Sequence, residues 1–279
     1  MSNMTQKKVL TIAGTDVSGG AGYAADIKTF EDHDLYGFCA LTTIVSMDPN
    51  TWSHRVHHVP LEVLDEQLET ALSLSPNTVK TGMLPNEDVI SRASEAIKKS
   101  DAEFFIFDPV MVCKGDDTVL NPGVVDSMQK ELLPISTIVT PNLVEAGNLA
   151  GMKTPKTVEE VKEAAKKIYE YGPKYVVIKG GTDLQVDEAL DIFYDGESFY
   201  GLYADKLEKA YNHGAGCTFA AAVASNFTNG LEPLEAVKAA KAFVASAIKH
   251  GSQMNEHVGV VRHNAYNKVG TVDVQVKPL

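Results

Sequence analysis

Cysteine is scarce in this sequence of 279 residues, which contains only Cys39, Cys113 and Cys217. An odd number of widely spaced cysteines does not indicate a disulfide framework and is typical of proteins in a reducing compartment. Long apolar runs are also missing, since no stretch approaches the ~18 residues needed to span a bilayer. Residues 1–8 are polar and do not resemble a signal peptide. We therefore expect a cytoplasmic protein without a membrane partner.

Basic residues are outnumbered, with 25 Lys and Arg against 37 Asp and Glu, which gives a net charge of −12. Because a nucleic-acid backbone requires a basic face, this balance argues against a nucleic-acid partner. A small nucleotide stays compatible, since a local phosphate-binding loop can work within an acidic protein. The length permits one large α/β domain or two small ones. We find no repeat, low-complexity segment or linker, and predict a single domain over residues 1–279.

Short continuous apolar runs alternate with amphipathic segments along most of the chain. Continuous runs are typical of strands buried on both faces of a parallel sheet. Such runs predict strands over 9–13, 37–45, 78–81, 104–107, 137–140 and 175–178, and helical spacing predicts helices over 61–72, 157–168 and 236–248. This alternation predicts a doubly wound, mostly parallel α/β sheet flanked by helices. Residues 191–194 and 198–203 predict a late antiparallel hairpin at the sheet edge.

Polar and glycine-rich segments follow four of the predicted strands. In an open parallel sheet, ligands bind outside the carboxyl ends of the strands. The segments are Gly14–Asp16 with Ser18–Gly22, Asp108–Met111, Pro141-Asn142 with Glu145, and Lys179–Asp183. Any one of them is compatible with an ordinary loop, but together they predict a ligand site at this edge of the sheet.

A glycine-rich turn, Gly214-Ala215-Gly216-Cys217, leads into a helix of small residues. The unpaired N–H groups and the positive dipole at the start of a helix suit a phosphate or a developing oxyanion. A cysteine in the first turn of such a helix should have a stabilised thiolate, which makes Cys217 a candidate base or nucleophile. The turn is also compatible with a loop before a core helix, in which Cys217 is a small apolar filler.

These motifs together resemble the vitamin-kinase branch of the ribokinase superfamily, the hydroxymethylpyrimidine and pyridoxal kinases. The resemblance spans residues 9–250 and rests on Ala13–Asp16, Ser18–Gly22, Lys80–Met83, Asp108–Met111, Thr140–Glu145, Lys179–Gly181 and Gly214–Cys217. Each motif is short, but their shared order and spacing make the combined signal specific. The resemblance implies a ribokinase-like fold and transfer of the ATP γ-phosphoryl group to a hydroxymethyl group on a small heteroaromatic ring.

The same resemblance implies residue roles. The N–H groups of Gly214–Gly216 would hold the transferring phosphoryl group, and Cys217, where most sugar kinases of the superfamily carry an aspartate, would accept the substrate proton. Glu145 and Asp108 would hold Mg²⁺. The residues expected to bind ATP are Asn142, Lys179, Gly180, Gly181, Thr182, Asp183, Asp191, Gly216 and Lys241. For Lys241, a solvated lysine on a helix is the alternative.

The segment after the second predicted strand favours a pyridine substrate. Pyrimidine kinases of the family typically carry a glutamine there that reads the pyrimidine edge, whereas this sequence has Met47. A methionine packs against a ring but cannot supply paired hydrogen bonds. We predict phosphorylation of the 5′-hydroxymethyl group of pyridoxal, pyridoxine or pyridoxamine; the alternative is a hydroxymethylpyrimidine (phosphate) kinase of thiamine biosynthesis, or a bifunctional enzyme. The residues expected to contact the substrate are Asp16, Gly22, Met47, His54, Met83, Val110 and Cys113.

Cys113 lies in a polar segment that forms a mobile lid over the substrate in relatives. A thiolate there, aided by Lys114, would trap the pyridoxal aldehyde as a hemithioacetal; the alternative is an exposed, idle thiol. Relatives often form homodimers, and exposed sheet edges offer a surface for this association. We therefore also expect a homodimer.

Two functions of other classes are compatible with an α/β chain. A nucleotide-binding sensor would keep Asn142 and Glu145 but should lack a base at the glycine-rich turn, so Cys217 disfavours it. A dinucleotide oxidoreductase would carry G-x-G-x-x-G directly after the first strand and an acidic residue at the end of the second. Gly14–Gly22 lacks that spacing, and the second strand ends in Val45-Ser46, so this function is also disfavoured.

Overall fold

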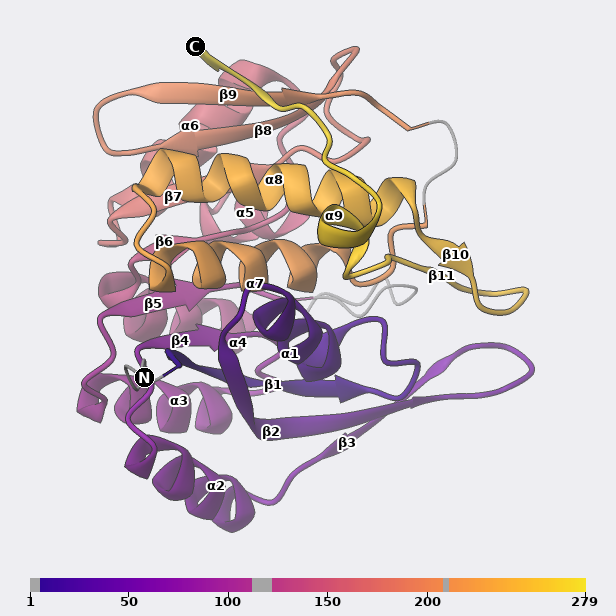
Figure 1. The fold of residues 1–279 in the computed structure, drawn as a ribbon. Coiled ribbons are helices and arrows are strands. Elements are labelled where there is room, and N and C mark those ends of the chain that lie inside the picture. Colours follow the sequence, from indigo (N-terminus) through magenta and orange to yellow (C-terminus); the bar gives the residue numbers. More distant parts are fainter. Residues whose placement is uncertain (1–5, 112–121, 208–210) are drawn as a thin grey trace, which may run out of the picture.

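The computed structural model describes residues 6–111, 122–207 and 211–279, and a ten-stranded sheet runs through the middle of the molecule (Figure 1). The strand order is β12-β9-β8-β7-β6-β5-β4-β1-β2-β3. The strands are β1 (Lys8–Asp16), β2 (Tyr36–Met47), β3 (His54–His58), β4 (Thr78–Thr81), β5 (Phe104–Phe107), β6 (Ile138–Val139), β7 (Tyr175–Lys179), β8 (Ala189–Tyr194), β9 (Phe199–Ala204) and β12 (Gln275–Pro278). A separate hairpin consists of β10 (Ser252–Gln253) and β11 (Gly259–Val260).

The centre of the sheet is parallel and its two sides are antiparallel. The strands from β2 through β1, β4, β5 and β6 to β7 pair in parallel. The antiparallel pairs are β2–β3 on one side, and β7–β8, β8–β9 and β9–β12 on the other. This confirms the predicted mostly parallel sheet with a late antiparallel hairpin. The winding reverses between β1 and β4, and such a reversal opens a crevice at the carboxyl ends of the strands.

The strand β12 is an element that the sequence pattern does not predict. It pairs Val276 with Leu202 of β9, so the predicted hairpin lies one strand inside the sheet edge. Four residues that include Lys277 and Pro278 carry too little apolar alternation to be recognised as a strand. The proline is tolerated because it ends an edge strand, where no further ladder hydrogen bond is required of it.

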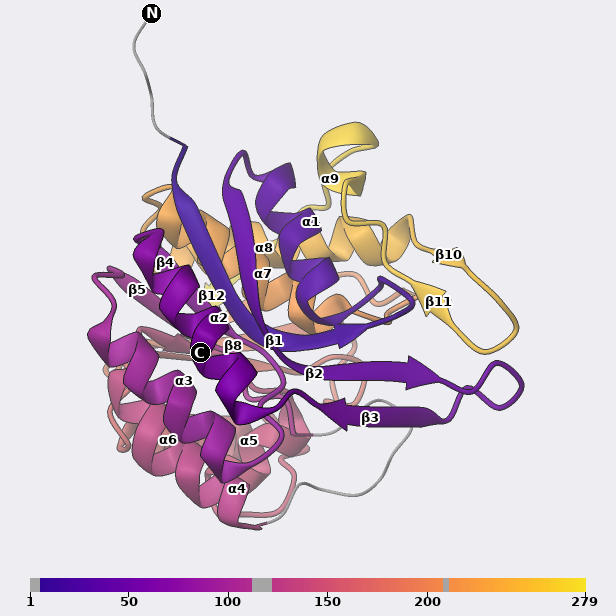
Figure 2. The same ribbon diagram turned by 90° about the horizontal axis from the view of Figure 1, so that it is seen from below.

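Helices cover both faces of the sheet, as the two views show (Figures 1 and 2). One face carries α1 (Gly22–Asp32), α7 (Ala215–Thr228), α8 (Pro233–Lys249) and α9 (Ala265–Lys268). The other face carries α2 (Leu61–Ser73), α3 (Glu87–Lys99), α4 (Pro122–Ser127), α5 (Leu143–Leu149) and α6 (Val158–Tyr169), and α4 continues into the short helical turns Met128–Leu132 and Leu133–Ile135. Two buried apolar clusters, one on each face, fill the space between these helices and the sheet.

Helix α7 is buried almost throughout, and its sequence explains why. Residues Thr218–Thr228 are all buried, and most of the helix consists of small or apolar residues. A helix that is apolar on every side has to lie within a core. The small side chains of Ala220–Ala222 let α7 pack between the sheet, α1 and α8. This packing fixes the start of α7, and with it Cys217, over the carboxyl ends of the central strands.

Among the residues that the structure describes, no helix combines the length and apolar character required to cross a membrane.

Candidate functional site

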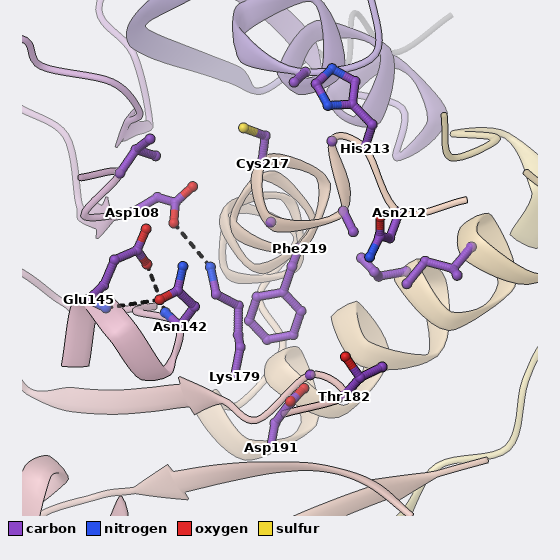
Figure 3. A pocket seen from close by; sticks show the side chains of 18 of the residues that line it. Asp108, Asn142, Glu145, Lys179, Thr182, Asp191, Asn212, His213, Cys217 and Phe219 are labelled. Carbon is purple, nitrogen blue, oxygen red and sulfur yellow. Dashed lines mark hydrogen bonds and ion pairs between the residues drawn. The ribbon is translucent and has the colours of Figure 1, made fainter. Parts of the chain in front are cut away.

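A cavity of about 640 Å³ lies at the carboxyl ends of the strands, where the sequence predicts a ligand site. Its wall is built from the ends of β1, β4, β5 and β7, the start of α5, the start of α7 and one side of α8. Figure 3 shows Cys217 and His213 on one side of the cavity, with Thr182 and Asp191 on the opposite side. The polar strand ends named from the sequence therefore do converge in one cavity.

The glycine-rich turn has the geometry of a helix start at the cavity wall. Gly214 is the N-cap of α7 with a φ of 85°, a left-handed conformation that favours glycine. A Cβ atom at Gly214 would lie 1.7 Å from the carbonyl oxygen of Gly20, so no side chain fits there. The loop after β1 and the turn before α7 thus pack backbone against backbone. The N–H of Ala215 donates to the Asn212 carbonyl at 3.1 Å, so the prediction of three free donors is wrong for Ala215.

The thiol of Cys217 lines the cavity in the first turn of α7, but its thiolate is not stabilised as predicted. Burial raises the pKa of this thiol to about 11, and the charge of Lys80 opposes the rise without offsetting it. The carboxylates of Asp26 and Asp108 add to the rise, whereas the Gly22 N–H lowers the pKa. In the free protein Cys217 is therefore a protonated thiol at neutral pH.

Asp108, Glu145, Asn142 and Lys179 form a cluster of polar groups in the cavity (Figure 3). Asn142 caps α5, accepting from the Glu145 N–H at 2.9 Å, while Glu145 accepts from the Asn142 N–H at 2.7 Å. Lys179 Nζ lies 3.2 Å from Asp108 Oδ1. Burial raises the pKa of Glu145 to about 7, against the opposing charge of Lys179. The helix cap thus places a carboxyl group that is partly protonated at neutral pH beside a carboxylate.

The same cluster has the chemistry of a magnesium site. Asp108 Oδ2 is buried and has no hydrogen-bond partner among the described residues, and Lys80 Nζ lies 4.0 Å from it. Mg²⁺ keeps several waters and takes only one or two carboxylates plus substrate phosphates. A site with two carboxyl groups facing a cavity, Asp108 and Glu145, meets that requirement.

The opposite side of the cavity is held together by an ion pair. Lys241 Nζ lies 2.8 Å from Asp191 Oδ2, and Asp191 Oδ1 accepts from the Gly180 N–H at 3.0 Å. Both side chains are buried, so the alternative of a solvated Lys241 is wrong. The loop Gly181–Asp183 follows directly and also lines the cavity. All the residues expected to bind ATP lie in the cavity wall.

Most residues expected to contact the substrate also line the cavity, namely Asp16, Gly22, His54, Met83 and Val110. Met47 pairs with His54 between β2 and β3 but is not among the lining residues, whereas Val45 is. Cys113 and Lys114 lie outside the described residues, so the proposed hemithioacetal stays a prediction.

His213 has a site contact that the sequence did not indicate. Its Nε2 lies 2.5 Å from Asp16 Oδ2, and Asp16 Oδ1 accepts from the Ser18 N–H at 2.8 Å. Burial acts to raise the pKa of Asp16, but the bonds from His213 and Ser18 outweigh it and lower that pKa. Asp16 is therefore an ionised carboxylate held in a fixed orientation, and only the tertiary fold brings His213 to it.

The ion pair of Lys80 with Asp26, behind the cavity wall, was also not predicted, although Lys80 belongs to one of the recognised motifs. Both side chains are completely buried, and Lys80 Nζ lies 3.0 and 2.9 Å from the two carboxylate oxygens of Asp26. A lysine within a buried strand was the available signal, because lysine is almost never fully buried without a partner. The partner could not be read from the sequence, since Asp26 lies 54 positions away.

Comparison with known proteins gives consistent results. Residues 16–262 match the family model described as phosphomethylpyrimidine kinase. The pyridoxine kinase of Bacillus subtilis (strain 168) is 46% identical over 264 residues, covering 94% of this chain and 97% of that protein. The structure of the pyridoxal kinase from Staphylococcus aureus in complex with ADP superposes with a TM-score of 0.96 at 53% identity, covering 99% of this chain and 100% of that one. The same S. aureus kinase in complex with AMP-PCP and pyridoxal gives a TM-score of 0.95 at 52% identity, with the same coverage.

Proposed function

The chain belongs to the phosphomethylpyrimidine kinase family, and we propose that it phosphorylates the 5′-hydroxymethyl group of pyridoxal, pyridoxine or pyridoxamine with ATP. One observation carries this proposal: the Lys179–Asp183 loop and the Cys217 turn of α7 face a single cavity. A nucleotide on the first and a hydroxymethyl group beside the second would meet there. The similarity to a kinase solved with AMP-PCP and pyridoxal supports the same pairing of ligands.

The reaction balances with groups of this chain. The substrate hydroxyl oxygen forms a bond to the γ-phosphorus, the bond from that phosphorus to the β,γ-bridging oxygen breaks, and ADP leaves. The hydroxyl proton passes to Cys217 in the small fraction of molecules in which this thiol has already lost its proton to water, because a thiol with a pKa of about 11 is mostly protonated at neutral pH. The N–H groups of Gly214 and Gly216 and the dipole of α7 stabilise the charge that spreads over the phosphoryl oxygens. Positioning, more than covalent chemistry, is what such a transfer demands.

We assign Mg²⁺ to Asp108 and Glu145. The orphaned Oδ2 of Asp108 fits a hard cation, and Lys179, which pairs with the other oxygen of Asp108, is within the cavity to receive phosphate. When bound, Mg²⁺ supplies positive charge that neutralises the phosphates. In the free protein, Lys179 holds the Asp108 carboxylate in place.

The side chains that line the cavity near β1, β2 and β4 favour the pyridine substrates over hydroxymethylpyrimidine. Val45, Met83 and Val110 contribute apolar surface at this end, and Asp16 and His54 contribute polar groups. None of these five residues has an amide side chain that could pair with both donor and acceptor atoms of a pyrimidine edge. The pyrimidine kinase of thiamine biosynthesis is the second candidate, because the matching family model carries that description.

The direct test is an assay with Mg-ATP and pyridoxal, pyridoxine or hydroxymethylpyrimidine, in which the phosphorylated product is identified by mass spectrometry. We expect the highest kcat/KM with a pyridine substrate, and no product in the presence of a magnesium chelator. Absence of product from all three substrates would overturn the proposal. Turnover of the pyrimidine alone would establish the second candidate.

Three further properties complete the proposal: one domain over residues 1–279, a homodimer, and a cytoplasmic location. A single sheet that runs from β12 to β3 supports the first. Exposed apolar residues on β2 and on the edge strand β3, such as Ile44 and Val56, offer surface for the second. Light scattering coupled to size exclusion should give twice the mass of the 30.1 kDa chain.

A further inference from the structure

The buried pair Lys80–Asp26 is part of neither the cavity wall nor the mechanism described above. Lys80 lies on β4 and Asp26 on α1, and both side chains are 0% exposed. Asp26 Oδ2 also accepts from the hydroxyl of Thr11 on β1 at 2.7 Å. The pair therefore bridges the two strands between which the sheet winding reverses.

Stability alone does not account for such a pair. Removing two charges from water costs more than their attraction returns in many proteins, and apolar replacements of buried pairs are often as stable or more stable. A buried ion pair is therefore weak support for a purely structural role. The position of the pair next to the cavity indicates a role in the reaction.

The Lys80 ammonium lies directly behind the cavity wall. Gly82 lines the cavity, and a Cβ atom at Gly82 would be only 3.3 Å from Lys80 Nζ. Asp108 Oδ2, the oxygen without a hydrogen-bond partner, is 4.0 Å from the same atom. The charge of Lys80 also acts on Cys217 at the start of α7. One enclosed cation thus acts on both Asp108 and Cys217, two of the side chains that line the cavity in Figure 3.

Counting charges shows why this cation matters. Lys80 and Lys179 face Asp26, Asp108 and the partly protonated Glu145 before any substrate enters, so the cluster has no surplus of positive charge. A thiolate at Cys217 and the phosphates of ATP add further negative charge to it. Lys179 lines the cavity and can turn to the phosphates, but Lys80 is enclosed and stays in place. In a medium of low dielectric, a fixed charge of this kind acts strongly.

We propose that Lys80, held by Asp26, is a positioning residue for catalysis: its enclosed charge orients Asp108 and stabilises negative charge on Cys217 during phosphoryl transfer. The proposal rests on the proposed kinase function. It assigns to the pair an effect on turnover that is separate from its effect on folding. Lys80 touches neither the nucleotide nor the second substrate.

Two variants separate the effect of the Lys80 charge on catalysis from any effect on folding. In Lys80→Met/Asp26→Asn, both charges are removed, and the asparagine still accepts from Thr11. In Asp26→Asn, Lys80 keeps its charge. The matched control is Thr78→Val/Thr228→Val, which removes a buried hydrogen bond of 2.7 Å between β4, which carries Lys80, and α7, which carries Cys217, at the ends of these elements away from the cavity.

We expect the double variant to unfold at a temperature close to that of the wild type and to keep its KM for ATP within about threefold, while kcat falls about 100-fold. The control should keep kcat within about twofold. A folded double variant with a kcat within threefold of the wild type would overturn the proposal. A wild-type chain without kinase activity would instead refute the proposed function.

A second readout does not depend on turnover or on the stability of the double variant. Alkylation of Cys217 by iodoacetamide, followed by peptide mass spectrometry at one fixed pH, reports how readily the thiolate forms. Asp26→Asn leaves the Lys80 charge uncompensated, so alkylation of Cys217 should be faster in this variant than in the wild type. The double variant lacks the Lys80 charge, so its Cys217 should be alkylated more slowly than in Asp26→Asn. Equal rates in all three proteins would show that the pair is structural only.

Discussion

Two lysine–aspartate pairs in which both residues are buried flank the cavity, and they differ in whether they can contact a bound ligand. Lys80–Asp26 has a separation of 2.9 Å and side chains that are 0% exposed. Lys241–Asp191 has a separation of 2.8 Å, but its side chains are 8% and 10% exposed and line the cavity. An enclosed pair acts on a ligand only through its field, whereas a lining pair can also contact it. We infer that the first serves turnover and the second serves nucleotide binding.

The largest expected effect is at Cys217, the group on which the Lys80 charge acts. Cys217→Ala should lower kcat by about 10²- to 10⁴-fold, because it removes the proton acceptor. Binding of ATP, measured by calorimetry, should change little. Cys39→Ala, on β2 outside the cavity wall, is the control and should turn over normally. Near-normal turnover of Cys217→Ala would remove this residue from the mechanism.

The raised pKa of Cys217 predicts how its alkylation depends on pH. Because the pKa is about 11, the thiolate fraction rises about tenfold for each unit of pH increase as long as the pH stays below 11. Alkylation of Cys217 should therefore accelerate about 100-fold between pH 8 and pH 10. A rate that levels off near neutral pH would mean that the thiol is acidic, and would contradict the burial argument.

Removal of the second pair should change binding more than turnover. In Lys241→Met/Asp191→Asn, the asparagine still accepts from the Gly180 N–H, so the loop that follows β7 keeps its anchor. A lost hydrogen bond to a charged group costs about 1.5–3 kcal/mol, which corresponds to a KM for ATP about 10- to 150-fold higher. Steady-state kinetics should show kcat within a few-fold of the wild type. A lower kcat at unchanged KM would break the distinction between the two pairs.

The smallest effects are expected at the β2–β3 end of the cavity, which contains neither pair. His54→Ala should raise the KM for pyridoxal about 2- to 12-fold through loss of one hydrogen bond. Met47→Ala should leave it within about twofold, because Met47 is not part of the cavity wall. The reverse order of effects would show that the methionine reads the ring after all.

The sequence predicted the elements whose signals are local. The parallel strands appear as continuous apolar runs, and α6 appears through its capping box, Thr157 with Glu160, which the structure contains. The convergence of polar strand ends was also predictable, because parallel strands place their carboxyl ends at one edge. The short edge strand β12 was not, since its pairing is decided by β9 alone.

Burial decides three features of the site that local sequence left open or predicted differently. Lys241 could be read as solvated, and it is enclosed in an ion pair with Asp191. Cys217 has the helix start that favours a thiolate, but burial outweighs it. Lys80 was recognised within a motif, yet its partner Asp26 is brought to it by tertiary packing. Local sequence indicates which groups are present, and the packed fold decides their charge.

The most direct test of the division between the pairs is a single turnover, followed by rapid quench with the enzyme in excess over pyridoxal and with saturating Mg-ATP. This measurement isolates phosphoryl transfer from nucleotide affinity. We predict a transfer rate about 100-fold lower in Lys80→Met/Asp26→Asn, and a rate close to the wild type in Lys241→Met/Asp191→Asn. Equal losses in the two variants, or a normal rate in the first, would contradict this prediction.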